Sequence, residues 1–427
     1  MSEMSDRQLE VRLQPTGGGE REPILDALRG FALLGILLIN IELMRGAELG
    51  RTMSGEQTPS TGADAVVHFL TGWLAAGKFI SSFAIMFGIG AALIATRSWR
   101  SGRAPRPLLA RRYLLLLPLG LAHMLLLFPG DILFAYGLAG LVLLVFVGVR
   151  ARTALLWAGS ILAVLLILGV GLSSLAASAA ELPADDPAMT AMEDFLEQRR
   201  EEAVAAHQDG GYGDVIVAHA WEALVLQVVT LLLLPWILAL FLMGYAVGRS
   251  GVVQDLSGHR RQLRTAMSAG LAIGLPLNIP TGMLGPLSTG AGVQPGGDDG
   301  ALVILATVGQ IVGAPILAVG YLSAVALLCL RIGPIGPLVS VGRMALTAYL
   351  LQSTLTLIVF AGFGLYERLT PPQGMLVVFG VWAVLLVVCP LWMSRFRFGP
   401  VEWLWRTATY GHRQPMRRVS VLRRDAG

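Results

Sequence analysis

The sequence predicts an all-α protein, a polytopic membrane helix bundle of about ten transmembrane helices with both termini in the cytoplasm (N-in and C-in). Of its 427 residues, 55% are hydrophobic and only 14% are charged, and the mean hydropathy is +0.67. Soluble domains average about 25% charged residues. Long apolar runs recur between residues 24 and 393, and arginines gather in alternate connections between them. These observations exclude a soluble globular domain.

A helix needs about 20 apolar residues to cross the hydrocarbon core of a bilayer, so we expect ten spans. They cover approximately residues 24–44, 66–95, 112–128, 131–149, 154–176, 221–248, 265–285, 301–330, 340–363 and 374–393, and together make a transmembrane bundle over 24–393. A polar segment, 1–23, precedes them and a basic tail, 394–427, follows them. The polar start is unlike a cleavable signal peptide, which favours an anchor as the first span.

The arginines predict the orientation, because cytoplasmic loops of membrane proteins are enriched in basic residues. With ten spans, the basic loop 96–111 and the tail 394–427 fall on the inner side. Three outer loops are then 45–65, 177–220 and 286–300. Within the second of these, MEDFLEQRREEAVAAH (192–207) predicts a short amphipathic helix.

The basic residues and the cysteines limit the function. All of the 32 basic residues except Lys78 are arginine. They lie in short loops, which suits membrane topology and lipid contact better than nucleic-acid binding. Cys329 and Cys389 lie within apolar spans and form no zinc pattern or disulfide framework, so we expect no metal site.

The stretch HMLLLFPGDILFAYG (123–137) places three polar residues in an apolar hairpin. Pro129 and Gly130 predict its outer turn, and Asp131 then suits a helix cap. His123 and Tyr136 are about equally far from this turn, so they share a depth and could hydrogen-bond across the two helices. The alternative is that His123 is a general base reached from the outer side.

Other polar residues lie in the spans, where a charge is costly. Asn40 and Glu42 are near the outer end of the first span. Glu42 could take part in a site there, or its side chain could extend to the membrane–water interface. Lys78 is near the centre of the second span, where an ammonium needs a carboxylate or an anionic ligand as its partner. Asp26, near the inner end of the first span, is spaced to pair with Arg29.

Arginines also mark the inner mouth of the bundle. Arg111 and Arg112 begin the third span, and Arg343 begins the ninth. Anchoring at the inner interface explains them, but together with Arg29 they could equally bind phosphates, for which the guanidinium fork is well suited.

Several blocks of the sequence resemble the YeiB-like membrane proteins. They include PILDALRGFALLGILLINI (23–41), RRYLLLLPLGLAHMLLLFPGDILFAYGLAG (111–140), GRMALTAYLLQS (342–353) and FGPVEWLWRTATYG (398–411), and they span nearly the whole chain. At the level of its first helix, this family resembles the broader transmembrane acyltransferases, which include heparan glucosaminide acetyltransferase-like and acyltransferase-3-like proteins. The resemblance implies a multi-pass protein of the bacterial cytoplasmic membrane.

The resemblance also implies a reaction. An acyl group would pass from cytoplasmic acyl-CoA, which is not bound permanently, to an extracytoplasmic glycan or lipid acceptor. His123 would deprotonate the acceptor or carry the acyl group, and Asp131 or Glu42 would orient it. Arg29, Arg111, Arg112 and Arg343 would hold the CoA phosphates. In acyltransferase-3-like relatives the histidine motif lies elsewhere, so the role of His123 does not transfer motif for motif.

Two other functions stay open, and so does the question of whether the protein is an enzyme. Prolines 276, 280 and 315 interrupt two spans, and with Lys78 they suit a small-molecule or lipid transporter or flippase. The basic tail suits anionic lipid headgroups, as in a non-catalytic membrane scaffold. The oligomeric state is also open, with a homodimer as one option.

Overall fold

The protein is an all-α helix bundle. The computed structural model describes residues 23–46, 62–179, 187–287 and 300–417, and within these ranges it contains helices and no β-strand apart from one isolated bridge between Phe396 and Arg417. The predicted fold class is therefore confirmed. Of the predicted segments, residues 1–22 at the start, 47–61, 180–186 and 288–299 in the outer loops and 418–427 in the tail lie outside the described residues.

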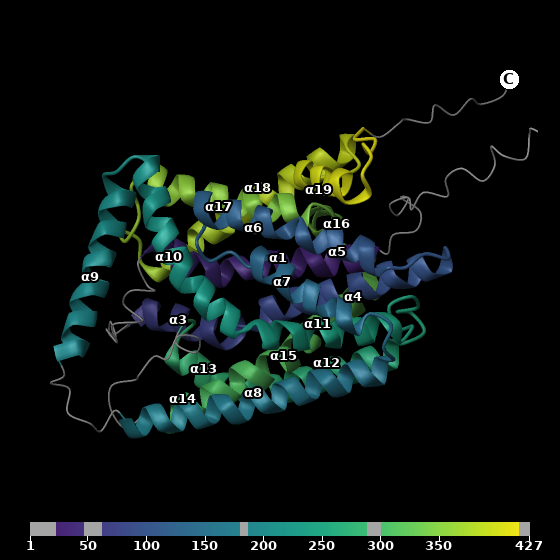
Figure 1. The fold of residues 1–427 in the computed structure, drawn as a ribbon, viewed down its shortest axis with the longest axis horizontal. Coiled ribbons are helices and arrows are strands. Elements are labelled where there is room, and N and C mark those ends of the chain that lie inside the picture. Colours follow the sequence, from purple (N-terminus) through teal and green to yellow (C-terminus); the bar gives the residue numbers. More distant parts are fainter. Residues whose placement is uncertain (1–22, 47–61, 180–186, 288–299, 418–427) are drawn as a thin grey trace, which may run out of the picture.

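The helices follow one another as in Figure 1. In chain order they are α1 (Pro23–Arg45), α3 (Gly62–Leu74), α4 (Lys78–Arg100), α5 (Arg106–Leu114), α6 (Leu116–Leu126), α7 (Leu133–Leu143), η2 (Leu144–Phe146), α8 (Ala151–Ala179), α9 (Pro187–Gln208), α10 (Tyr212–Leu232), α11 (Leu234–Arg249), α12 (Arg260–Leu277), α13 (Ile279–Leu284), α14 (Gly300–Val308), η3 (Gly309–Gly313), α15 (Ala314–Ile332), α16 (Gly336–Arg343), α17 (Ala345–Leu357), η4 (Ile358–Gly362), α18 (Pro371–Arg395) and α19 (Pro400–Tyr410).

Most of the helices run along the long axis of the bundle, and α9 crosses one end of it (Figure 1). We call this the α9 end. The opposite end carries the connections α4–α5 and α11–α12 together with α19, and we call it the arginine end. Among the described residues, eight helices are long and apolar enough to cross a membrane, and Leu133–Phe146 and Leu234–Arg249 are shorter apolar helices. The protein is thus polytopic, and the count of ten spans and the orientation stay predictions.

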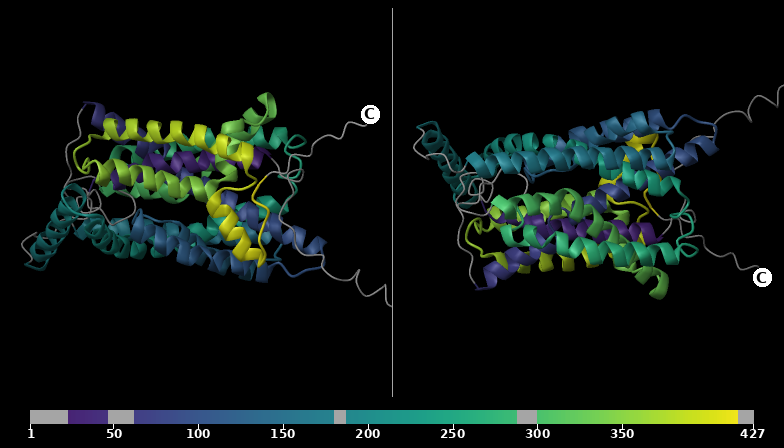
Figure 2. Two further views of the ribbon diagram at one scale, coloured as in Figure 1. Left: turned by 90° about the horizontal axis from the view of Figure 1, so that it is seen from above. Right: turned by 90° about the horizontal axis from the view of Figure 1, so that it is seen from below.

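The core divides into two clusters, one around α4, α7 and α11 and one around α1, α17 and α18. In the first cluster, α4 and α11 approach closely at Gly88 and Gly244, where an added Cβ would collide with the backbone of Phe241 and Ile85. Small residues at such contacts are typical of membrane helices. Figure 2 shows α8 and α18 on opposite sides of the bundle. Only 6% of the apolar window of α8 is buried, as expected of a lipid-facing helix.

The second predicted span is broken. α3 ends at Leu74 and α4 begins at Lys78, because Gly77 between them has a φ of 76°, a conformation that favours glycine. The sequence placed Lys78 near the centre of a continuous span, whereas in the structure it lies beside a helix break. The amphipathic pattern at 192–207 falls within α9.

Candidate active site

Three buried polar side chains from separate parts of the chain meet inside the bundle. His123 of α6 places Nδ1 at 2.8 Å from Asp131 Oδ1 and Nε2 at 2.9 Å from the Oγ of Ser353 on α17. Each of the three residues is 1% exposed. His123 thereby links the α6–α7 hairpin to α17. A carboxylate, an imidazole and a hydroxyl are joined in that order by two hydrogen bonds. We call these residues the His123 triad.

The chemistry of the partners assigns the protons of the triad. An ionised carboxylate can only accept, so Nδ1 of His123 carries the proton that faces Asp131. In the neutral imidazole, Nε2 then accepts the hydrogen bond from the Ser353 hydroxyl. Acid, base and nucleophile follow one another in this order in serine hydrolases and transferases of unrelated folds. His123 is thus oriented as a base toward a hydroxyl.

The turn between α6 and α7 positions the first two members of the triad. The second oxygen of Asp131, Oδ2, accepts the backbone N–H of Phe134 at 2.8 Å, so the carboxylate caps α7 and orients His123 at the same time. Gly120 allows the two helices to approach, because a Cβ there would lie 2.7 Å from Asp131 Oδ2. Gln227 of α10 donates from Nε2 to the Asp131 carbonyl at 3.1 Å.

Tyr349 completes the surroundings of the imidazole. Its ring lies 4.8 Å from the His123 ring, measured between centroids, and it is one helical turn before Ser353 on α17. Its hydroxyl is buried and lies near the Ile132 backbone, and within the described residues it donates to no acceptor of good geometry. Among the described residues, no acceptor is therefore assigned to the Tyr349 O–H, which lies beside the triad.

The predicted contact between His123 and Tyr136 is wrong. The Tyr136 hydroxyl donates to the carbonyl of Ile80 on α4 at 3.0 Å, and its ring packs against Phe87 and Phe241. The spacing of the two residues from the turn does not fix how each side chain is rotated about its helix axis. Tyr136 points toward α4 and α11, whereas His123 points toward α17.

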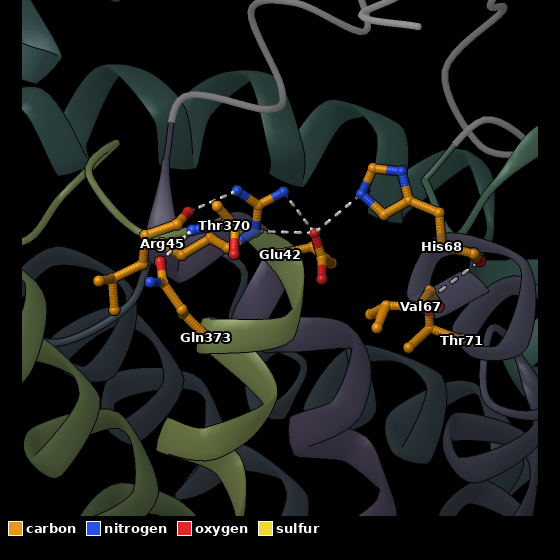
Figure 3. A network of polar contacts seen from close by, with 8 residues as sticks. Glu42, Arg45, Val67, His68, Thr71, Thr370 and Gln373 are labelled. Carbon is orange, nitrogen blue, oxygen red and sulfur yellow. Dashed lines mark hydrogen bonds and ion pairs between the residues drawn. The ribbon is translucent and has the colours of Figure 1, made fainter. Parts of the chain in front are cut away.

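Glu42 belongs to a different network, at the α9 end of α1 (Figure 3). Its Oε2 accepts from Arg45 Nε at 2.9 Å and lies 3.7 Å from His68 Nε2. Arg45 also donates to the Leu369 carbonyl. Asp131, and not Glu42, is therefore the carboxylate that contacts His123. Asn40 is buried on α1, two residues before Glu42.

A cavity of about 690 Å³ lies at the arginine end of the bundle. Its size is within the range of small-molecule and cofactor sites. Six arginines from five segments line it, and they are Arg29, Arg97, Arg100, Arg112, Arg343 and Arg406. Two carboxylates, Asp26 and Glu402, also line it, and aromatic and aliphatic side chains make up most of the rest, including Phe83, Phe87, Leu116, Leu133 and Tyr136. The cavity thus combines a strongly basic mouth with an apolar interior.

The inner wall of this cavity is close to the His123 triad. Leu116 lies seven residues before His123 on α6, and Leu346 lies seven residues before Ser353 on α17, and both line the cavity. Seven residues of α-helix rise about 10 Å. Leu133, also in the wall, is two residues beyond Asp131. All three helices therefore lead from the cavity to the triad within about two turns.

The mouth of the cavity contains three of the four arginines that the sequence suggested for phosphates. Arg29 donates to Asp26 at 2.8 Å, and the Arg112 guanidinium stacks over the Trp405 ring at 4.0 Å. Arg343 lines the cavity from the end of α16. Arg111, in contrast, is exposed on α5 and does not line the cavity.

The C-terminal helix α19 closes one side of the mouth. Glu402 of α19 accepts hydrogen bonds from the backbone N–H groups of Leu346 and Thr347 at the start of α17 and from the Thr347 hydroxyl. Burial raises the pKa of the Glu402 carboxyl, and these hydrogen bonds oppose the shift. The carboxylate thereby fixes α19, with Trp405 and Arg406, against the cavity.

Two histidines at the α9 end lie near one another. His207 of α9 and His219 of α10 place their Nε2 atoms 3.4 Å apart, and the His207 ring stacks on Tyr366 with centroids 4.1 Å apart. Burial lowers the pKa of His207, and its hydrogen bond with the Ala203 carbonyl opposes the shift. In the described ranges, no three His, Cys, Asp or Glu side chains come together as metal ligands.

The comparisons with known proteins agree with the blocks noted in the sequence. YxaH of Bacillus subtilis (strain 168) is 31% identical over 424 residues, which cover 95% of this chain and 98% of YxaH. YeiB of Escherichia coli (strain K12) is 31% identical over 401 residues, which cover 91% of this chain and 96% of YeiB. The chain belongs to the YeiB-like family. A family model described as a protein of unknown function, DUF418, also matches residues 247–412 of this YeiB-like chain.

Sequence reasoning missed several residues of this YeiB-like site. Ser353 ends the block GRMALTAYLLQS. A serine in an apolar helix usually donates a hydrogen bond to a backbone carbonyl of the same helix, so the sequence does not indicate a partner on another helix. Tyr349, in the same block, reads as an ordinary core residue. Arg97, Arg100 and Arg406 are typical of inner loops, and only the fold shows that they share a cavity with Arg112.

Proposed function

We propose that this YeiB-like protein is a membrane acyltransferase of the bacterial cytoplasmic membrane. It transfers an acyl group from cytoplasmic acyl-CoA to a hydroxyl or amine of a glycan or lipid on the other side. The observation that carries the proposal is the arginine-lined cavity whose apolar inner wall leads, within about two helical turns, to the buried His123 triad.

The cavity suits the parts of an acyl-CoA molecule. CoA has phosphate groups at one end, which arginine guanidinium groups bind well, and a long arm that ends in the thioester. Phosphates at Arg112 and Arg343 would leave the arm to extend along the apolar wall formed by Phe87 and Leu116. The thioester would then approach His123, which faces a hydroxyl as a general base does.

CoA binding tests this proposal. The thermal shift of the purified protein on adding CoA should be reduced in Arg112→Ala and in Arg343→Ala. Loss of one hydrogen bond to a charged group, about 1.5–3 kcal/mol, corresponds to about 10- to 150-fold weaker binding. Arg111→Ala is the matched control, because Arg111 is adjacent in sequence but outside the cavity. Equal effects at Arg111 and Arg112, or no shift in the wild type, would contradict the proposal.

A transporter is the second candidate, and a cluster of helix breaks favours it. Gln310 of η3 packs against Gly77 at the α3–α4 break, and Asn278 at the α12–α13 break packs against Gly313. Within the described residues, one side-chain oxygen of Gln310 and one of Asn278 have no hydrogen-bond partner. Lys78, fully buried nearby, donates to the Gly72 carbonyl at 2.9 Å. Substrate sites of transporters often lie at such broken helices.

The two candidates differ in a flux assay. Protein reconstituted in liposomes is incubated with a fluorescent phospholipid and without any acyl-CoA, and the transfer of that lipid between leaflets is measured. Rapid transfer that is lost in Lys78→Met would favour the flippase. No transfer, together with a CoA shift that Lys78→Met retains, would favour the acyltransferase.

A further inference from the structure

Ser353 is placed to react and not only to hold His123. We propose that Ser353 is the nucleophile that takes the acyl group from CoA, so that transfer occurs in two stages through an ester on the Ser353 hydroxyl. This inference rests on the proposed acyltransferase function and assigns its covalent intermediate.

The hydrogen bonds of Ser353 differ from those of two other buried serines, Ser81 and Ser82. Ser81 and Ser82 of α4 donate to carbonyls one turn earlier on their own helix, at 2.6 Å and 2.9 Å. The corresponding distance from Ser353 Oγ to the Tyr349 carbonyl is 3.4 Å, whereas His123 Nε2 is at 2.9 Å. The Ser353 proton therefore points to a base, which is the arrangement that activates a hydroxyl for attack.

The surroundings supply the two other parts that such a nucleophile needs. Asp131 fixes the His123 tautomer in which Nε2 can accept a proton. Tyr349, one turn from Ser353, has a buried hydroxyl that donates to no acceptor of good geometry among the described residues, and this O–H can donate to an oxygen that gains negative charge. Acid, base, nucleophile and oxyanion donor are thus all present within α6, α17 and the α6–α7 turn.

In the first stage, Ser353 Oγ attacks the thioester carbonyl carbon while its proton passes to His123 Nε2. The tetrahedral intermediate places its negative oxygen at the Tyr349 hydroxyl. The C–S bond then breaks, the CoA sulfur takes the proton from His123, and free CoA and an ester on Ser353 result. In the second stage, the acceptor hydroxyl or amine attacks the ester, its proton passes to His123, and Ser353 Oγ recovers that proton as the acyl product leaves.

Two stages suit a protein whose substrates lie on opposite sides of a membrane. CoA carries several charges and cannot cross the hydrocarbon core, so the donor stays at the arginine end. Ser353 lies about two turns beyond the cavity wall, and the acyl ester there is separated from the departed CoA. The acceptor can therefore reach the acyl group without meeting the donor.

Isotope exchange tests this inference without any knowledge of the acceptor. Purified protein is incubated with tritiated CoA and unlabelled acyl-CoA of short, medium or long chain, and labelled acyl-CoA is measured. An ester intermediate predicts exchange in the absence of acceptor, with loss in Ser353→Ala and a fall of about 10²- to 10⁴-fold in His123→Ala. Ser82→Ala is the matched control, since it removes another buried hydroxyl of the bundle outside the triad, and should leave exchange unchanged.

Mass spectrometry of the same samples locates the acyl group. We expect an adduct on Ser353 in the wild type, and in Ser353→Cys a thioester at the same position that neutral hydroxylamine removes. An adduct on His123, an adduct retained in Ser353→Ala, or binding of CoA without exchange or adduct would overturn the inference but leave the acyltransferase proposal standing. A wild type that neither binds CoA nor exchanges would overturn both.

Discussion

Asp131 both orients His123 and caps α7, and two substitutions distinguish these roles. Its Oδ1 contacts His123 Nδ1 and its Oδ2 caps α7 at the Phe134 N–H. Asp131→Asn keeps an oxygen for the cap, since asparagine caps helices as well as aspartate does. It offers an amide N–H to His123, however, which favours the tautomer with the proton on Nε2. That tautomer cannot accept the Ser353 proton.

The expected magnitudes follow from these contacts. Asp131→Ala removes the cap, at about 1 kcal/mol, and leaves the His123 N–H buried without a partner, at about 1–3 kcal/mol. We therefore expect the free energy of unfolding to fall by about 2–4 kcal/mol. For Asp131→Asn we expect a loss below about 1 kcal/mol, but a fall in acyl exchange on the order of 10³- to 10⁴-fold, because the base has the wrong tautomer.

Unfolding in mixed detergent micelles measures the stability, and isotope exchange between acyl-CoA and CoA measures the activity. Asp255→Asn is the control, because Asp255 is an exposed carboxylate that accepts the Gly258 N–H outside the triad. It should change neither quantity. An Asp131→Asn variant with wild-type exchange would refute the tautomer argument. An Asp131→Ala variant as stable as the wild type would show that neither the helix cap nor the contact with His123 stabilises the fold.

Three further substitutions test other parts of the account. Gly120→Ala should cost about 1–3 kcal/mol of stability and lower the exchange rate, since its Cβ would push α6 from α7, whereas Gly159→Ala on α8 has open space and should do neither. Burial lowers the pKa of His207, so its contribution to stability is present above the unfolded pKa of about 6.5 and is lost as the pH falls. The melting temperature of His207→Phe should therefore drop less than that of the wild type between about pH 8 and about pH 5, and an equal drop would exclude His207 as the cause. Glu42→Gln should lower stability, because it weakens the buried pair with Arg45, yet leave exchange per folded molecule unchanged. A loss of exchange as large as in His123→Ala would instead make Glu42 catalytic.

The sequence predicted the parts of the fold that depend on hydropathy alone. Apolar runs long enough to cross a bilayer indicated a polytopic helix bundle. Basic segments that alternate with these runs, such as the α4–α5 and α11–α12 connections, lie together at the arginine end (Figure 1). The break before Lys78 was not predicted, because a glycine within an apolar run is common in membrane helices, and only its φ of 76° shows the break.

The sequence predicted one contact of the candidate site and missed others. His123, Asp131 and Tyr136 were placed near one outer turn, and Asp131 does contact His123. The spacing of residues along a chain, however, does not fix how each helix is rotated or which helices are neighbours. For this reason Tyr136 was assigned to the wrong partner, and Ser353, 230 residues away along the chain, was not assigned at all.

A structure of the protein with a non-hydrolysable acyl-CoA analogue tests the central claim most directly. The account predicts the CoA phosphates at Arg112 and Arg343, and the carbonyl carbon of the analogue about 3–3.5 Å from the Ser353 hydroxyl, the separation at which a bound group reacts. An analogue bound elsewhere on the protein, or a cavity that stays empty at saturating analogue, would contradict it.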